Sequence, residues 1–285
     1  MPEINWYPGH MAKAKRLLIQ QIKAVDAIIE ICDARAPAST RNPDLVRLAN
    51  GKQRLIVLNK ADLANENITA DWIKRYKSMG FLAASVNSNG GKTREVLAMI
   101  EQMTKPAVER MKARGVNKTV RAMIVGIPNV GKSTFINRIG KQKIAKVADR
   151  PGVTRSNQWI KVGPYLEMLD TPGLLWPRLS DEEGARTLAW LGSIKDIILD
   201  QEALAASLLS RLMQMAPKQT TDRFKLADVT GEVPGHELLE AACAGRGWLM
   251  SQGRPDTIRA AAIVLDEFRA GKIGRVTLEK PYRGE

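Results

Sequence analysis

The sequence contains Gly126-Ile127-Pro128-Asn129-Val130-Gly131-Lys132-Ser133 directly after the apolar run Ala122-Met123-Ile124-Val125. This stretch fits the pattern G-x-x-x-x-G-K-[ST], in which a buried strand leads through a glycine-rich turn into a helix. In such a turn the backbone N–H groups and the helix N-terminus face negative charge. The stretch therefore predicts a phosphate-binding loop.

Two side chains of this loop carry predicted roles. We expect Lys132 to reach the β- and γ-phosphates of a nucleotide, and the Ser133 hydroxyl to ligate Mg²⁺. The residues expected to contact the nucleotide from this part of the chain are Asn129, Val130, Gly131, Lys132, Ser133 and Thr134.

A second motif, Asp170-Thr171-Pro172-Gly173, ends a predicted strand about 40 residues after the loop. We expect Asp170 to hold the metal through water and the Gly173 N–H to contact the γ-phosphate, a contact that exists only with the triphosphate. Between the two motifs, Thr154 is the candidate to close over Mg²⁺ with its hydroxyl. The alternative for that segment is an ordinary turn built on Pro151-Gly152.

Asn59-Lys60-Ala61-Asp62 ends the apolar run Arg54–Leu58. A carboxylate in a base pocket accepts two hydrogen bonds from guanine N1 and N2, and adenine lacks that pair of donors, so Asp62 is expected to select guanine. Lys60 is expected to lie over the base and Asn59 to tie loops together. Ser85-Val86-Asn87, at the end of the next run, is expected to give a backbone N–H to the guanine carbonyl.

Strands alternate with helices through the first 178 residues, a pattern typical of an α/β fold with a mostly parallel sheet and helices on both faces. A basic helix over residues 11–23 precedes the first strand, and residues 158–169 resemble a hairpin. Beyond residue 184 the pattern is helical. We therefore predict a nucleotide-binding domain over 1–178, which includes the N-terminal basic helix, and a helical domain over 179–285.

The chain has 285 residues and a net charge of +14. Residues 1–179 hold 30 of the 44 basic residues and 14 of the 30 acidic ones, so a polyanion such as RNA is expected on that part. The alternative is a merely solvated basic surface. The basic tail residues from Arg269 to Arg283 are a second candidate RNA contact. No apolar run approaches the ~20 residues of a membrane span, so we expect a cytoplasmic protein without a membrane partner.

The order of the motifs is unusual, because the guanine-reading motif precedes the phosphate-binding loop. With this order the sequence resembles the circularly permuted GTPases of the TRAFAC class. The motifs Trp6–Met11, Asp33-Ala34-Arg35-Ala36-Pro37, Asn59–Asp62, Gly126–Ser133 and Asp170–Gly173 resemble those of the YlqF/RbgA ribosome-biogenesis GTPases. The resemblance covers the whole chain. It implies GTP and GDP as ligands, late assembly of the large ribosomal subunit as the function, and rRNA and ribosomal proteins as partners. Separately, we expect a monomer.

Many GTPases place a glutamine after D-x-x-G to orient the attacking water, but this chain has Leu174 there. Three sources of a replacement stay open: His10, a monovalent cation such as K⁺ held by Asn129, or a partner acting in trans. We hypothesise that His10 orients the water when a ribosomal partner orders it; the alternative is that His10 is structural or contacts RNA. We expect slow hydrolysis alone and stimulation by ribosomal particles.

Two functions compete at this point. One is an assembly GTPase whose hydrolysis times its release from the ribosomal particle. The other is a non-catalytic, GTP-dependent RNA-binding module, with Leu174 marking lost hydrolysis. Because the chain leaves the nucleotide domain directly after Asp170–Gly173, we also expect closure of that loop to reorient residues 180–285.

Overall fold

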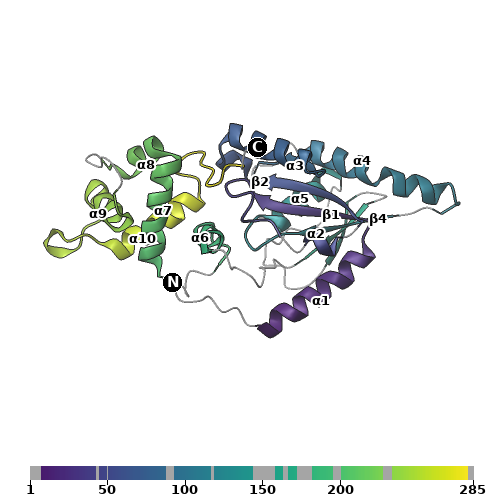
Figure 1. Cartoon of the computed structure of the whole chain (residues 1–285), viewed down its shortest axis with the longest axis horizontal. Coiled ribbons are helices and arrows are strands. Elements are labelled where there is room, and N and C mark those ends of the chain that lie inside the picture. The colour runs from purple at the N-terminus through teal and green to yellow at the C-terminus, as the bar shows by residue number, and fades with distance from the viewer. Residues whose placement is uncertain are drawn as a thin grey trace.

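The structure is a computed structural model of the whole chain (Figure 1). The residues that it describes are 8–42, 45–49, 51–87, 93–116, 119–143, 158–162, 166–171, 182–194, 200–226 and 233–281. A sheet flanked by helices occupies one end of the molecule, and a group of helices occupies the other (Figure 1).

The sheet has six strands in the order β3-β2-β1-β4-β6-β5. All neighbouring strands pair in parallel except β5 and β6, which form the antiparallel pair predicted for residues 158–169. The strands are β1 (Ala27–Asp33), β2 (Gln53–Asn59), β3 (Leu82–Ser85), β4 (Val120–Val125), β5 (Gln158–Lys161) and β6 (Leu166–Asp170).

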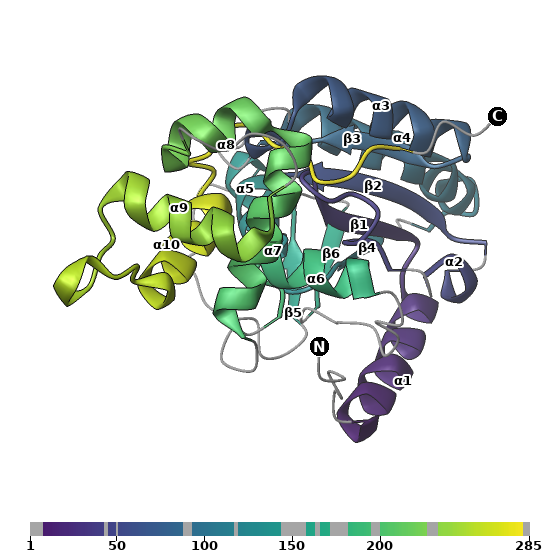
Figure 2. The same cartoon turned by 60° about the vertical axis from the view of Figure 1, so that its left-hand side comes forward.

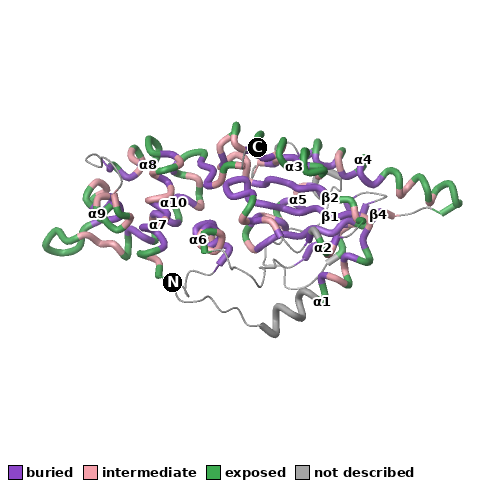
Figure 3. The backbone as a smooth tube through the Cα atoms, in the orientation of Figure 1, coloured by how far each residue is buried: buried purple, intermediate pink, exposed green. Residues whose placement is uncertain are grey.

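Helices cover both faces of this sheet. Successive side chains along a strand point to opposite faces, so the buried residues of β1 show which helices cover which face. On β1, Ile29 and Ile31 face a core built with α4 (Thr93–Lys112) and α5 (Lys132–Lys143). Ile28 faces the other way, toward α1 (Pro8–Ala24) and α2 (Leu45–Leu48), and Cys32 lies in the cluster with α3 (Glu66–Ser78). β1 is consequently buried along its whole length (Figure 3).

The strands that carry the two nucleotide motifs, β2 and β4, lie on either side of β1 in the sheet. β1, β2 and β3 come first in the chain and form one half of the sheet. β4 belongs to the other half, pairs with β1 and leads into the phosphate-binding loop. The predicted α/β fold with a mostly parallel sheet and helices on both faces is confirmed.

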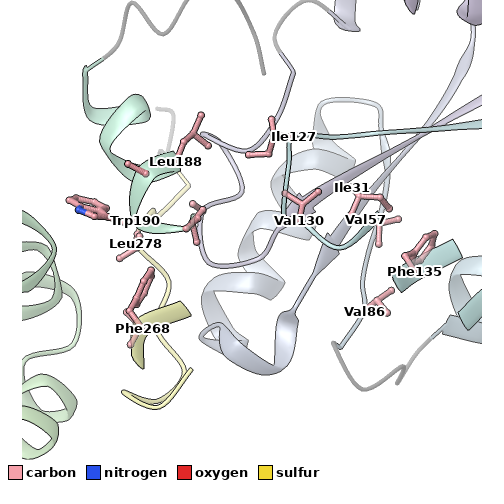
Figure 4. Close-up of a cluster of buried hydrophobic side chains, with 14 of the residues drawn as sticks. Ile31, Val57, Val86, Ile127, Val130, Phe135, Leu188, Trp190, Phe268 and Leu278 are labelled. Carbon is pink, nitrogen blue, oxygen red and sulfur yellow. The ribbon is translucent and has the colours of Figure 1, made fainter. Parts of the chain in front are cut away.

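The rest of the chain is helical, as predicted. The helices are α6 (Glu182–Trp190), α7 (Gln201–Met215), α8 (Pro217–Phe224), α9 (Gly235–Arg246) and α10 (Thr257–Arg269). Leu188, Trp190 and Phe268 belong to one continuous buried cluster with sheet and loop residues such as Ile31 and Val130 (Figure 4). Within the described residues, no helix is long and apolar enough to span a membrane.

The last described segment, residues 275–281, leaves the helical region and runs back to α3 (Figures 1 and 2). We call it the C-terminal strap. Its backbone N–H groups at Val276 and Leu278 donate to the carbonyls of Leu63 and Arg35, at 3.1 and 2.7 Å. The indole of Trp72 on α3 donates to the Glu279 carbonyl at 3.0 Å. Val276 and Leu278 are both buried.

Two features differ from the sequence-based expectation. The sequence predicts that residues 105–121 form a basic connecting stretch, but the helix that begins at Thr93 continues to Lys112, although Pro106 lies inside it. Proline removes one intrahelical hydrogen bond, but the helix continues because Val108 still packs on the core. The strap is the second difference, since it returns a piece of the predicted helical domain to the nucleotide-binding half. The proposed domain boundary at residue 178 lies outside the described residues.

Candidate nucleotide site

The predicted site residues follow the carboxyl ends of parallel strands, where open α/β sheets bind ligands. Asn59 is the last residue of β2, Ser85 of β3 and Asp170 of β6, and Gly126 directly follows β4. Four segments that are far apart in the sequence therefore share one edge of the sheet.

The phosphate-binding loop connects β4 to α5, as predicted. The ammonium of Lys132 lies over the loop and donates to the carbonyls of Gly126 at 3.1 Å and Ile127 at 2.8 Å. Burial lowers the pKa of Lys132 to about 8, and the nearby Asp170 opposes that shift. A buried cation beside a concave loop at a helix N-terminus suits an oligophosphate, whose negative charge would offset the cost of burying the ammonium.

Two glycines are required where the loop passes close to its neighbours. A Cβ on Gly126 would lie 2.5 Å from the Ile31 carbonyl oxygen, and one on Gly131 would lie 2.4 Å from Asn59 Nδ2. Gly131 also has a φ of +91°, a conformation that side chains disfavour. The loop is therefore pressed against both β1 and the guanine-reading motif.

Ser133 and Asp170 meet beside the start of α5. The Ser133 hydroxyl donates to Asp170 Oδ2 at 3.2 Å, and Asp170 is 5% exposed. The next residue, Thr171, donates its hydroxyl to the Ile124 carbonyl at 2.6 Å, which fixes the end of β6 against β4. A hydroxyl and a carboxylate oxygen are hard ligands of the kind that Mg²⁺ takes beside phosphate, so this donor set fits the predicted ion.

The motif Asn59-Lys60-Ala61-Asp62 is joined to the phosphate-binding loop by two hydrogen bonds. Asn59 Nδ2 donates to the Val130 carbonyl at 2.8 Å, and Lys60 Nζ donates to the Asn129 carbonyl at 2.6 Å. Lys60 and Asn129 both have a positive φ, of 59° and 64°. Such strain is kept where surrounding contacts enforce it, typically at functional sites. The predicted tie between the two motifs is therefore present.

Asp62 lies in a short 3₁₀ turn, Ala61–Leu63, and is partly exposed. The Ala61 N–H donates to the Val86 carbonyl at 3.1 Å, which brings the predicted segment Ser85–Asn87 beside this turn. The N–H of Val86 donates to the Leu58 carbonyl at 2.9 Å. Because that donor is already used, an N–H for guanine has to come from another residue of the segment.

A cavity of about 250 Å³ adjoins both guanine-reading segments. Its lining residues are Ala61, Glu66, Thr69, Ala70, Ile73, Ser85, Asn87 and Arg275. Of the basic tail residues, Arg275 pairs with Glu66 at 3.4 Å, whereas Arg269 donates to the carbonyls at the end of α6. Arg269 therefore helps to hold α10 against α6, and its RNA contact stays a prediction.

Residues of the helical region also contact the site, which the sequence did not predict. Asn129 Nδ2 donates to the Gly192 carbonyl at 2.5 Å, and the Ser193 hydroxyl donates to the Pro128 carbonyl at 2.9 Å. Residues 192–193 lie just beyond the end of α6 at Trp190. The phosphate-binding loop is thus held by the guanine-reading motif on one side and by the helical region on the other.

Several predicted residues lie outside the part of the chain that the structure describes. These are Thr154, Gly173, Leu174 and the side chain of His10. Their roles stay predictions, although α1, which contains His10, begins at Pro8 and confirms the predicted basic helix.

Known proteins resemble both parts of this chain. A family described as "50S ribosome-binding GTPase" matches residues 121–204. "Ribosome biogenesis GTPase A" of Bacillus cereus is 43% identical over 280 residues, which cover 98% of this chain and 94% of that protein. The chain belongs to the ribosome biogenesis GTPase A family.

More distantly related proteins also match this chain over nearly its whole length. "Mitochondrial ribosome-associated GTPase 1" of Mus musculus is 32% identical, and the match covers 97% of this chain and 90% of that protein. The crystal structure of GNP-bound YlqF from T. maritima is 28% identical with a TM-score of 0.63, covering 95% of this chain and 99% of that one. Membership of the ribosome biogenesis GTPase A family confirms that the chain binds and hydrolyses GTP.

Proposed function

We propose that this chain is an assembly factor that acts in late maturation of the large ribosomal subunit, with GTP hydrolysis timing its release. The observation that carries this proposal is the joining of Asn59 and Lys60 to the phosphate-binding loop, in a chain whose relatives are named for ribosome biogenesis. Its partners would be rRNA and ribosomal proteins, and the acting form a monomer in the bacterial cytoplasm.

In this proposal the nucleotide lies across the edge of the sheet. Asp62 accepts hydrogen bonds from guanine, and a backbone N–H of the segment Ser85–Asn87 donates to the guanine carbonyl. Lys132 neutralises the β- and γ-phosphates, which the backbone N–H groups from Asn129 to Thr134 surround. The contacts of Asn59 and Lys60 with the loop fix the base pocket relative to the phosphates, which is the positioning that phosphoryl transfer requires.

Mg²⁺ would be held by Ser133 and Thr154, and by Asp170 through water. When bound it would neutralise charge on the phosphates. Asn129 is the residue proposed for K⁺; its Nδ2 already contacts Gly192, so the amide oxygen would be the ligand. Turnover that is faster in KCl than in NaCl at equal ionic strength supports this role, and equal turnover contradicts it.

Leu174 leaves the attacking water without the usual glutamine, so we propose that His10 orients it on the ribosomal particle. The test is GTP turnover of His10→Ala, alone and with large subunits. A loss of the stimulated rate with an unchanged basal rate supports the role. An unchanged stimulated rate assigns His10 to structure or to RNA contact.

The function itself is tested by sedimentation with purified large subunits. The expected result is co-sedimentation with a non-hydrolysable GTP analogue and release with GDP. Co-sedimentation that does not depend on the nucleotide contradicts a release timed by hydrolysis. Single-turnover GTP cleavage with and without the subunits then measures the proposed stimulation.

A further inference from the structure

Asp33 and Arg35 form a buried ion pair directly behind the nucleotide site. Asp33 ends β1 opposite Asn59 of β2, and the two side chains of the pair are only 1% and 2% exposed. Arg35 donates from Nε to Asp33 Oδ1 at 3.0 Å and from Nη2 to Oδ2 at 2.8 Å. This bidentate geometry fixes the orientation of the Asp33 carboxylate.

The Asp33 carboxylate also contacts Lys60. The distance from Lys60 Nζ to Asp33 Oδ2 is 3.1 Å, and the same Nζ donates to the Asn129 carbonyl. Burial alone would raise the pKa of Asp33, but Arg35 and Lys60 hold that pKa well below its ordinary value. Asp33 therefore stays ionised and supplies a fixed negative charge to the lysine of the guanine-reading motif.

Arg35 reaches in the opposite direction, to the end of α10. Its Nη1 donates to the carbonyls of Phe268 at 3.1 Å and Arg269 at 3.3 Å, and its guanidinium lies 5.1 Å from the centre of the Phe268 ring. The last carbonyls of a helix have no partner within the helix and carry partial negative charge. Arg35 thus caps α10 while it holds Asp33.

We propose that Asp33 is a positioning residue for Lys60, and that Arg35 makes this positioning depend on the end of α10. The inference rests on the proposed role of Lys60 in guanine nucleotide binding. The positive φ of Lys60 makes such support necessary, because its backbone conformation is disfavoured on its own. Through these contacts the helical region acts on the guanine-reading motif as well as on the phosphate-binding loop.

The test is a double-mutant cycle with Asp33→Asn and Lys60→Met, read as the Kd for fluorescent GDP on the folded full-length chain. If Asp33 acts through Lys60, Asp33→Asn weakens GDP binding about 10-fold in the parent chain but less than about 2-fold in the Lys60→Met background. A merely structural Asp33 gives the same factor in both backgrounds, which would overturn the inference. GDP binding unchanged by Lys60→Met overturns the proposed role of Lys60 instead.

Glu30→Gln is the matched control. Glu30 is also a buried carboxylate on β1 and is also paired with arginines, Arg41 and Arg54, whose guanidinium groups lie over the Phe81 ring. The substitution Glu30→Gln should lower the free energy of unfolding and leave the Kd for GDP unchanged. An equal loss of GDP affinity in Glu30→Gln and Asp33→Asn contradicts a specific role for Asp33.

A second pair of variants tests the link to α10 and serves also if Asp33→Asn does not fold. Phe268→Leu keeps an apolar side chain but removes the ring beneath Arg35, whereas Val264→Ala changes another buried position of the same helix. Phe268→Leu should weaken GDP binding about 2- to 5-fold, and Val264→Ala should leave it unchanged. Unchanged binding in Phe268→Leu breaks the proposed link to α10.

Discussion

Gly131→Ala is the substitution whose effect follows most directly from the geometry of the site. The new Cβ would lie 2.4 Å from Asn59 Nδ2, far inside ordinary contact distance, and the residue has a φ of +91°. Either the Asn59 amide moves away or the loop does. Both movements break the 2.8 Å hydrogen bond from Asn59 to the Val130 carbonyl, which joins the two nucleotide motifs.

The magnitude has two parts. A side chain in the left-handed region costs about 1–2 kcal/mol. Breaking a buried hydrogen bond and leaving a partner unsatisfied costs about 1–3 kcal/mol more. We therefore expect the free energy of unfolding to fall by about 2–5 kcal/mol. Because the broken hydrogen bond joins the two nucleotide motifs, nucleotide binding should weaken by at least about 10-fold.

Gly80→Ala is the matched control, since Gly80 has a φ of +83° but nothing within 4 Å of an added Cβ. Chemical denaturation and the Kd for fluorescent GDP are the measurements. Gly80→Ala should lower the free energy of unfolding only by the cost of a side chain at a positive φ, and its Kd for GDP should be unchanged. In an Asn59→Ala background, Gly131→Ala should cost no more than Gly80→Ala does. Equal effects of the two glycine substitutions in the parent chain would refute the reasoning.

Three further outcomes are expected. Leu278→Ala should lower the free energy of unfolding by about 2–5 kcal/mol in chemical denaturation, because Leu278 is fully buried in the strap; a change below 1 kcal/mol contradicts that packing. Ser193→Ala removes the hydrogen bond to the Pro128 carbonyl and should speed GDP release a few-fold in stopped-flow measurements; an unchanged release rate would contradict a role of this contact in holding the phosphate-binding loop. Removing Mg²⁺ with EDTA should weaken GTP-analogue binding in the parent chain more than in Ser133→Ala, and equal sensitivity would exclude Ser133 as a ligand.

The sequence was sufficient for features that local pattern or motif chemistry determines. Apolar runs located the strands, and the sequence placed motif residues such as Asn59 and Asp170 at the ends of those strands, as the structure shows. The helix beyond Pro106 was missed because proline usually ends a helix, and here packing of Val108 outweighs that preference.

The contacts missed from the sequence join residues that are distant along the chain. Arg35 bonds to Phe268, and Asn129 bonds to Gly192, and neither pair leaves a periodic signal. The C-terminal strap has no regular structure, so only its buried residues reveal it. One signal was available for Asp33: like Asn59, it ends an apolar strand, so its carboxylate was a candidate for the same edge of the sheet.

The most direct test of the site as a whole is the base preference of Asp62→Asn. If the Asp62 carboxylate, which precedes the phosphate-binding loop in the sequence, selects guanine, the variant changes the base preference; the Kd values for GDP and for xanthosine diphosphate are measured on the parent chain and the variant. Asp62→Asn should bind GDP about 100-fold more weakly and should bind xanthosine diphosphate, which carries an oxygen in place of the 2-amino group, better than the parent chain does. A variant that keeps the parent chain's preference for GDP would contradict the assignment of Asp62 and the base pocket built on it.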